Sequence, residues 1–127
     1  TYSAHPVGAA AVIACLSETE RLDTKFNAQV RGTQLYNGVM ELAKKHTIVG
    51  DVRGGHGLML GIELVSDQSK KTPLDTSDMK KIHQKTYEFG AMVRLGLNNI
   101  LMSPPLTISE NEVNQILGAL DEGLTAI

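Results

Sequence analysis

The sequence predicts an α+β fold, in which helices pack on a small, mainly antiparallel sheet. Three observations favour this fold class. Apolar residues recur with the period of a helix in the first third of the chain, and the pattern then changes to the alternation of a strand. Glycines between two such strands mark a turn or a bulge. Helical periodicity returns before and after a further pair of short strands.

The first helix is expected from Pro6 to about Thr19. Proline suits the first turn of a helix because it lacks the N–H that would be unpaired there. The segment is apolar nearly all round, and a helix of that kind is normally covered on every side. We therefore expect the chain, which starts without a methionine, to be a piece of a longer protein.

The second helix is expected at about 25–45, where Gly32 and Gly38 weaken it locally. Its apolar stripe consists of Leu35, Val39 and Leu42, with Phe26 and Val30 a few turns earlier.

Two strands are expected at about 48–54 and 57–65. The second alternates Leu58, Leu60, Ile62 and Leu64 on one face with Met59, Gly61, Glu63 and Val65 on the other. Residues 66–75 are polar and predict a loop. Short strands at about 91–94 and 100–102, joined by a turn, complete the predicted sheet.

The third helix is expected at about 76–89 and ends at Gly90, a residue type that suits a helix C-terminus. Its apolar face comprises Met79, Ile82, Thr86 and Phe89. Ser109 and Glu112 predict a capping box at the start of the last helix. That helix carries the clearest amphipathic stripe in the chain: Val113, Ile116, Leu117, Leu120 and Leu124.

Composition excludes several classes of function. The chain has 127 residues, 42% of them hydrophobic, and a net charge of −2, so nothing indicates a basic surface for nucleic acid or anionic membrane. The longest apolar run is too short to span a bilayer, and because no basic region precedes an apolar core we expect no secretory signal. The single cysteine excludes an internal disulfide and fits a reducing cytosol, so we expect a cytoplasmic protein.

Metal binding and nucleophilic catalysis are disfavoured. His5, His46, His56 and His83 are widely spaced and fit surface or loop positions. Cys15 lies within an apolar helix, where a buried, inert thiol is expected. The glycine-rich sequence RGGHG joins strand to strand, so we interpret it as a structural hairpin and not as a phosphate loop.

Two stretches remain as candidates for a site. TYSAHPVG places hydroxyl groups ahead of a helix start, where they cap the helix or help to bind an anion. Arg94 stands among apolar residues, with no acidic residue nearby in the sequence. One interpretation is an edge-strand residue that keeps its charged head in water. The other is a carboxylate-binding residue, since the planar guanidinium can donate two parallel hydrogen bonds to a carboxylate. The residues alone leave both pairs of alternatives open.

Three motifs in order resemble the C-terminal portion of class III pyridoxal-phosphate-dependent aminotransferases, the omega-aminotransferase group. They are TYSAHPVGAAA, VGDVRGGHGLMLGIELV and VRLGLNNILMSPPLTISENEV, and the resemblance covers essentially the whole chain. One departure is a hairpin, 53–57, that is a residue longer than the form common in the family.

The resemblance implies a fold type I enzyme that binds pyridoxal 5'-phosphate and works as a homodimer or higher homo-oligomer. Residues 1–24 would belong to the end of the large-domain and interface segment with a linking helix, and residues 25–127 to the C-terminal small domain. By resemblance, Thr1 contacts the cofactor phosphate of the neighbouring subunit, and Arg94 binds the substrate carboxylate and swings aside for uncharged substrates.

The resemblance also implies that the lysine that links the cofactor, and the acid beside its ring nitrogen, precede this chain. No lysine here matches the catalytic position, so the chain contributes no catalytic residue of its own. The implied reaction is transfer of an amino group from an omega-amino acid or amine to an oxo acid such as pyruvate. A diamine or diaminopelargonate-forming aminotransferase is an alternative within the family, and an isolated, non-catalytic dimerisation or binding module is an alternative of another class.

Overall fold

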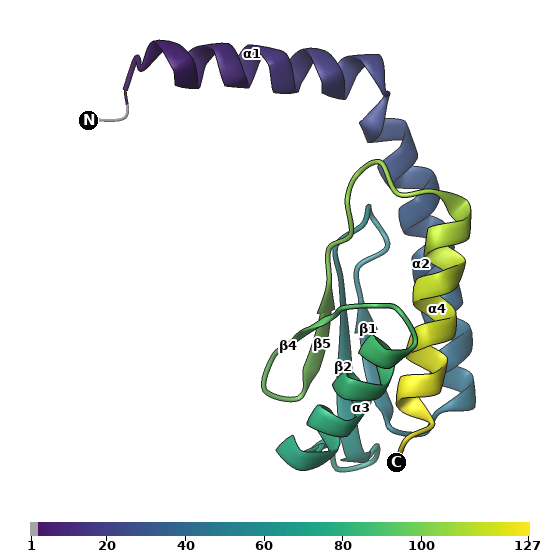
Figure 1. The fold of residues 1–127 in the computed structure, drawn as a ribbon. Coiled ribbons are helices and arrows are strands. Elements are labelled where there is room, and N and C mark those ends of the chain that lie inside the picture. Colours follow the sequence, from purple (N-terminus) through teal and green to yellow (C-terminus); the bar gives the residue numbers. More distant parts are fainter. Residues whose placement is uncertain (1–2) are drawn as a thin grey trace.

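An antiparallel sheet with helices on one face forms the body of the protein in the computed structural model, which describes residues 3–127 (Figure 1). The strands of the main path are β1 (Val49–Arg53), β2 (Leu60–Asp67), β5 (Asn99–Met102) and β4 (Arg94–Leu95), in that order. The short β3 (Thr72–Pro73) pairs with the far end of β2. All of these pairings are antiparallel, so the predicted fold class is confirmed.

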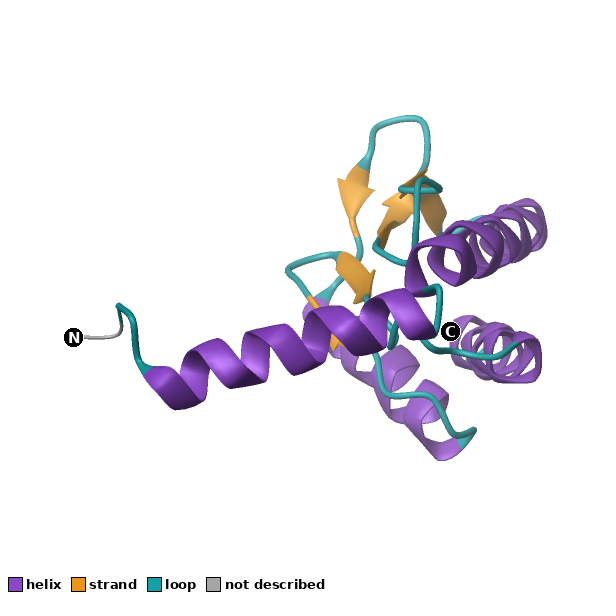
Figure 2. Cartoon of the chain, turned by 90° about the horizontal axis from the view of Figure 1, so that it is seen from above, coloured by secondary structure: helices purple, strands orange, loops and turns teal. Residues whose placement is uncertain are grey.

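The helices differ in how they relate to this sheet. In Figure 2, α2 (Thr24–Lys45), α3 (Thr76–Glu88) and α4 (Glu110–Leu124) lie on one side of the strands, and α1 (Pro6–Arg21) extends away from them. Asp23, with a φ of 45°, turns the chain between α1 and α2, and its side chain accepts a hydrogen bond from the Phe26 N–H. No residue of α1 is buried within this chain.

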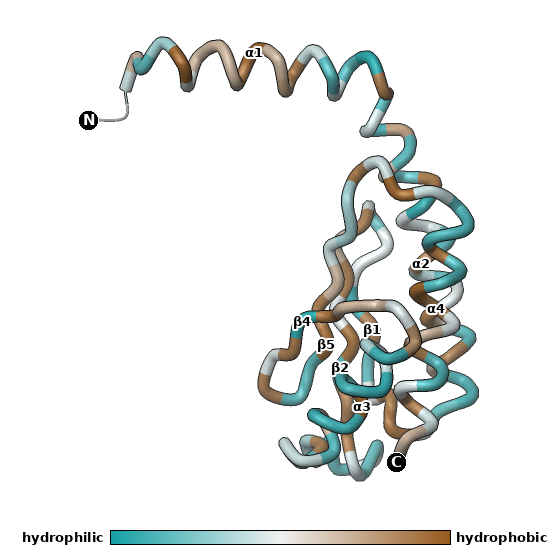
Figure 3. The backbone as a smooth tube through the Cα atoms, in the orientation of Figure 1, coloured by the Kyte–Doolittle hydropathy of each residue, from teal (hydrophilic) through white to brown (hydrophobic). Residues whose placement is uncertain are grey.

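The core lies between the sheet and α2, α3 and α4. Alternation along β2 points Leu60, Ile62 and Leu64 at the helices, and all three are buried as predicted. They meet residues from α2, α3 and α4, namely Leu35, Val39, Met79, Ile82, Val113 and Leu120. Figure 3 shows apolar residues along the strands of the sheet, and also several on the uncovered α1.

Several sequence-based boundaries were wrong. Leu58 and Met59 lie in the β1–β2 connection, since β2 begins at Leu60. Part of the predicted loop 66–75 is strand, because β2 continues to Asp67 and pairs with β3. Residues 91–93 are not part of a strand, so β4 is shorter at this end than predicted and begins at Arg94. In each case backbone pairing, and not side-chain polarity, fixes where the strand ends.

Val65 and Phe89 also depart from the predicted faces. Val65 was placed opposite the core yet is buried, beside a register irregularity between β1 and β2. Phe89 is the C-cap residue of α3 and is exposed, with the Lys85 ammonium 4.9 Å from its ring centre. Gly90 follows with a φ of 96°, which ends the helix where predicted.

Helix α2 spans nearly the predicted residues, and its two interior glycines lie at close contacts with other elements. A Cβ on Gly32 would overlap the backbone of Gly57 in the β1–β2 connection, and one on Gly38 would overlap Leu117 of α4. These glycines therefore allow close packing. Phe26 and Val30, predicted near the apolar stripe, are exposed, whereas their neighbour Ala28 packs against the core.

Candidate substrate-binding site

Arg94 lies on the face of the sheet that the helices do not cover. Arg94 on β4 is directly opposite Leu101 on β5. Across the next two strand pairs, Leu101 is opposite Gly61 on β2, and Gly61 is opposite Arg53 on β1. We call these four residues the outer row. Residues opposite one another in adjacent strands share a face, so the outer row runs across the sheet with an arginine at each end.

The two arginines differ in their surroundings. Arg53 Nε donates to Asp51 Oδ2 over 2.8 Å, and this hydrogen bond holds the pKa of the Asp51 carboxyl below its usual value. The side chain of Arg94 is exposed, and within residues 3–127 it makes no hydrogen bond or ion pair. Arg94 therefore presents a guanidinium that is available to an anion from outside the chain.

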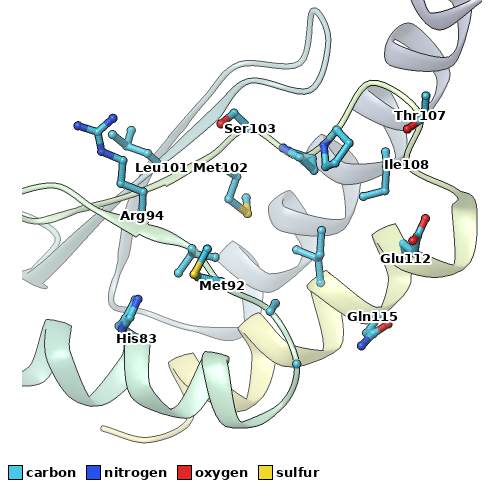
Figure 4. A pocket seen from close by; sticks show the side chains of 16 residues that line it. His83, Met92, Arg94, Leu101, Met102, Ser103, Thr107, Ile108, Glu112 and Gln115 are labelled. Carbon is cyan, nitrogen blue, oxygen red and sulfur yellow. The ribbon is translucent and has the colours of Figure 1, made fainter.

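A hollow of about 790 Å³ adjoins Arg94. Its walls come from the segment before β4, the Pro-Pro loop after β5 and the facing sides of α3 and α4. In Figure 4, Arg94 and Leu101 lie next to one another at its rim, and the guanidinium points away from Glu112 and Gln115 of α4. The charged head of Arg94 thus faces outward from the sheet and not into the hollow.

The Pro-Pro loop is held in place by α2. Asn27 Nδ2 donates to the carbonyl oxygens of Leu106 and Ile108, at 2.8 and 3.0 Å. Ser109 and Glu112 then form the predicted capping box: the Glu112 N–H donates to Ser109 Oγ over 3.3 Å, and the Ser109 N–H donates to Glu112 Oε2 over 2.8 Å. These contacts fix the connection between β5, which carries Leu101, and α4.

The other candidate position, Thr1, lies outside the described residues, so its predicted role stays a prediction. Ser3 is exposed, and the cap of α1 is His5, whose Nδ1 accepts a hydrogen bond from the Gly8 N–H at 3.4 Å. Capping by a Ser3 hydroxyl is therefore not what the structure shows. The first turn of α1 also contains no acidic residue.

The structure corrects the expected burial of one cysteine, Cys15, and one histidine, His46. Cys15 is exposed and not buried, because no residue of α1 is buried within the described residues 3–127. His46 was expected at the surface, but its side chain is only 10% exposed and its Nε2 lies 2.7 Å from Asp121 Oδ1. Lys45 Nζ also donates to both Asp121 oxygens, at 2.7 Å. Sequence spacing gave no signal of this contact, because its partners are 75 positions apart.

The lysines lie at the surface, as solvated charges should. Lys85 is half-buried. The other seven lysines are exposed: Lys25, Lys44, Lys45, Lys70, Lys71, Lys80 and Lys81.

Among residues 3–127 no group of three or more His, Cys, Asp or Glu side chains converges on a metal site. In the same part of the chain, no helix has both the length and the apolar character needed to cross a membrane.

Comparison with known families decides what this arrangement belongs to. Residues 1–124 match the family model described as aminotransferase class-III. The chain belongs to the class III aminotransferase family. As a class III aminotransferase chain it carries the three motifs noted above within a single matched region, which confirms the resemblance seen in the sequence.

Relatives of this class III chain are much longer than it is. It is 34% identical to an alanine–glyoxylate aminotransferase 2 homologue, mitochondrial, from Arabidopsis thaliana, over 98% of this chain and 26% of the relative. It is 30% identical to a leucine/methionine racemase from Thermococcus litoralis, over 100% of this chain and 28% of the relative. The chain spans about a quarter to a third of the length of such relatives.

Solved structures agree on the fold. An amine transaminase from an uncultivated Pseudomonas species, in its PLP-bound form, superposes with a TM-score of 0.92 at 36% identity, over 98% of this chain and 28% of that one. Pyridoxal phosphate is the cofactor of the class III aminotransferases. The described residues near the start of α1 are compatible with the cofactor phosphate. The Ser3 hydroxyl is exposed, and the first turn of α1 contains no acidic residue, so the N–H groups of the helix N-terminus suit an anion.

Proposed function

We propose that this chain is the C-terminal part of a pyridoxal-phosphate-dependent enzyme that transfers an amino group from an omega-amino acid or amine to an oxo acid such as pyruvate. The observation that carries the proposal is Arg94, an exposed guanidinium on the open face of the sheet without a partner among residues 3–127. The family match supplies the reaction class, and the similar amine transaminase supports the choice of an amine donor.

In this proposal Arg94 binds the carboxylate of the amino acid or oxo acid. A guanidinium offers two parallel N–H donors to a carboxylate, which fixes the orientation as well as the position of the substrate. With the carboxylate held, the amino or oxo carbon has a defined position relative to the cofactor. For an amine without a carboxylate the same side chain swings aside, and its exposed position leaves room for that motion.

When bound, pyridoxal phosphate supplies the electron sink on which transamination depends. Thr1 is the residue of this chain that we assign to its phosphate, as the hydroxyl donor ahead of α1. The lysine that links the cofactor is assigned to a part of the enzyme outside these residues. The lysines of this chain lie at its surface, in keeping with that assignment.

Oligomeric state and domain organisation belong to the same proposal. We assign residues 1–24 to the large-domain and interface segment with its linking helix, and residues 25–127 to the small domain of a homodimer or higher homo-oligomer. The burial pattern supports the division, since no residue of α1 is buried among residues 3–127 and the buried hydrophobic core starts with Leu35 in α2. We also propose a cytoplasmic enzyme, on the single, unpaired cysteine of the sequence.

The proposal is tested by Arg94→Ala in the holoenzyme. Each charged hydrogen bond to the carboxylate is worth about 1.5–3 kcal/mol, so KM for an oxo acid should rise at least about tenfold. KM for a simple aldehyde acceptor should change little, since an aldehyde makes no such bonds. Steady-state kinetics with both acceptors measures the two values.

Arg53→Ala is the matched control, because Arg53 occupies the other end of the outer row and is already paired with Asp51. It should alter KM for the two acceptors to the same extent. An equal effect of Arg94→Ala on oxo acid and aldehyde would overturn the assignment of Arg94 to the carboxylate.

A further inference from the structure

The surroundings of Arg94 within the sheet are set by Leu101. The two residues are directly opposite each other in the β4–β5 pair, so their Cβ atoms are about 4.5–5.5 Å apart. Val93, which directly precedes β4, and Met102, which follows Leu101 in β5, are both buried, whereas Arg94 and Leu101 are exposed together on the open face. The methylene stem of Arg94 therefore has Leu101 as its cross-strand neighbour.

Leu101 is itself seated on Gly61. A Cβ placed on Gly61 would lie 3.6 Å from Leu101 Cδ2, so the leucine side chain leans across the glycine toward the middle of the sheet. That distance is an ordinary van der Waals separation, so Leu101 lies against the open side of Gly61 without strain. Leu101 is still 42% exposed, and its outer surface forms part of the same rim as Arg94 in Figure 4.

Within residues 3–127, β5 is the one strand that pairs with β4. β4 is the last strand of the main path and comprises two residues. The side chain of Arg94 makes no hydrogen bond or ion pair within residues 3–127, and the register places Leu101 beside its stem, where Figure 4 shows the two side chains next to one another. Long cationic side chains commonly lay their methylene groups on apolar surface while the charge stays in water.

We propose that Leu101, seated on Gly61, is a positioning residue for Arg94: it supports the arginine stem and thereby sets how tightly the enzyme binds carboxylate-bearing substrates. This inference rests on the proposed function, since it assumes that Arg94 binds the carboxylate. Leu101 touches neither the charge of the substrate nor the reacting atoms in this account. It acts by reducing the number of conformations that Arg94 must give up when the carboxylate binds.

The test is Leu101→Ala in the holoenzyme, measured with an oxo acid and with a simple aldehyde. Ordering one additional rotamer-rich side chain on binding should raise KM for the oxo acid about two- to tenfold. The aldehyde KM, and kcat for both acceptors, should stay within about twofold, because the reacting groups are untouched. Leu101→Met, which keeps an apolar side chain of similar volume, should restore most of the oxo-acid KM.

A double-mutant cycle separates this inference from the proposed function. In an Arg94→Ala background, Leu101→Ala should add no further selective effect, since the residue through which it acts is gone. Leu97→Ala is the matched control: Leu97 is a leucine in the turn between β4 and β5, 92% exposed and outside the outer row. It should leave the ratio of the two KM values unchanged.

Three results would overturn the inference. If Arg94→Ala acts selectively on the oxo acid but Leu101→Ala does not, the proposed function stands and the positioning role is wrong. If Leu101→Ala lowers kcat equally for both acceptors, Leu101 has a general structural role. If Arg94→Ala affects both acceptors equally, the proposed function of Arg94 fails, and the role of Leu101 fails with it.

Discussion

At the scale of single residues, Asp121 joins the end of α2 to α4. Its carboxylate accepts hydrogen bonds from Lys45 and lies within 2.7 Å of His46 Nε2. The hydrogen bonds from Lys45, and secondly from His46, hold the pKa of Asp121 below its usual value. The folded protein therefore stabilises the charged form of this carboxyl more than the unfolded chain does.

The sign of the pH dependence follows from that lowered pKa. Asp121 contributes stability above the pKa of an unfolded aspartate, about 3.9, and loses the contribution as pH falls through the folded pKa below it. Asp121→Asn should thus lower the free energy of unfolding at pH 7, and the difference from the parent protein should shrink below about pH 4. Urea unfolding at pH 7 and pH 3.5 measures both differences.

Glu41→Gln is the control for this prediction. The Glu41–Lys44 pair has both side chains 70% exposed, and such surface pairs contribute little. A difference between Asp121→Asn and the parent that is the same at both pH values would contradict the account of Asp121.

The residue scale also shows where sequence reasoning stops. A short strand ending at Arg94 was predicted from the sequence, and an edge strand was one of the two settings that the residues allowed. The neighbours Leu101 and Gly61 could not be identified, because they are set by register between strands that are distant in sequence. The contact between His46 and Asp121 was missed for the same reason.

At the scale of elements, the approach of the β1–β2 connection to α2 depends on Gly32. A Cβ there would overlap the backbone of Gly57, which cannot turn aside as a side chain can. Gly32→Ala should therefore destabilise the protein by about 1–3 kcal/mol, despite the better helix propensity of alanine. Thermal or urea unfolding of the variant measures this loss.

Gly118 in α4 provides the matched comparison. It is exposed and no atom lies near the position of its missing Cβ, so Gly118→Ala should stabilise the protein by about 0.5–1 kcal/mol. Two glycines in helices are thus expected to respond with opposite signs. Stabilisation by Gly32→Ala would contradict the close packing between α2 and the hairpin.

Helices were easier to predict from the sequence than strands. The capping box at Ser109 and the glycine after α3 are local signals, and both helix boundaries agree with them. The length of β4 and the β2–β3 pairing depend on which backbone lies alongside, which the sequence pattern does not contain. Exposure of Phe26 and of Cys15 likewise depends on what packs on α1 and the start of α2, and not on their own sequence.

At the scale of the whole molecule, two regions expose apolar or charged side chains that residues 3–127 leave uncovered. The uncovered helix α1 exposes Val7, Val12, Ile13 and Leu16, and the open face of the sheet exposes Arg94 and Leu101. An apolar helix without a covering layer is unusual for a complete domain. Both regions fit the proposal that this family member works as part of a larger, oligomeric aminotransferase.

Transfer of nitrogen between two substrates tests the central claim most directly, since the relatives include a protein named as a racemase as well as aminotransferases. The holoenzyme is incubated with a ¹⁵N-labelled amine and pyruvate, and the label in alanine is measured by mass spectrometry. The account predicts labelled alanine in an amount equal to the carbonyl compound formed from the amine, and no turnover when either substrate is omitted. Release of the label as ammonia, or inversion of an amino acid without transfer of its nitrogen, would contradict it.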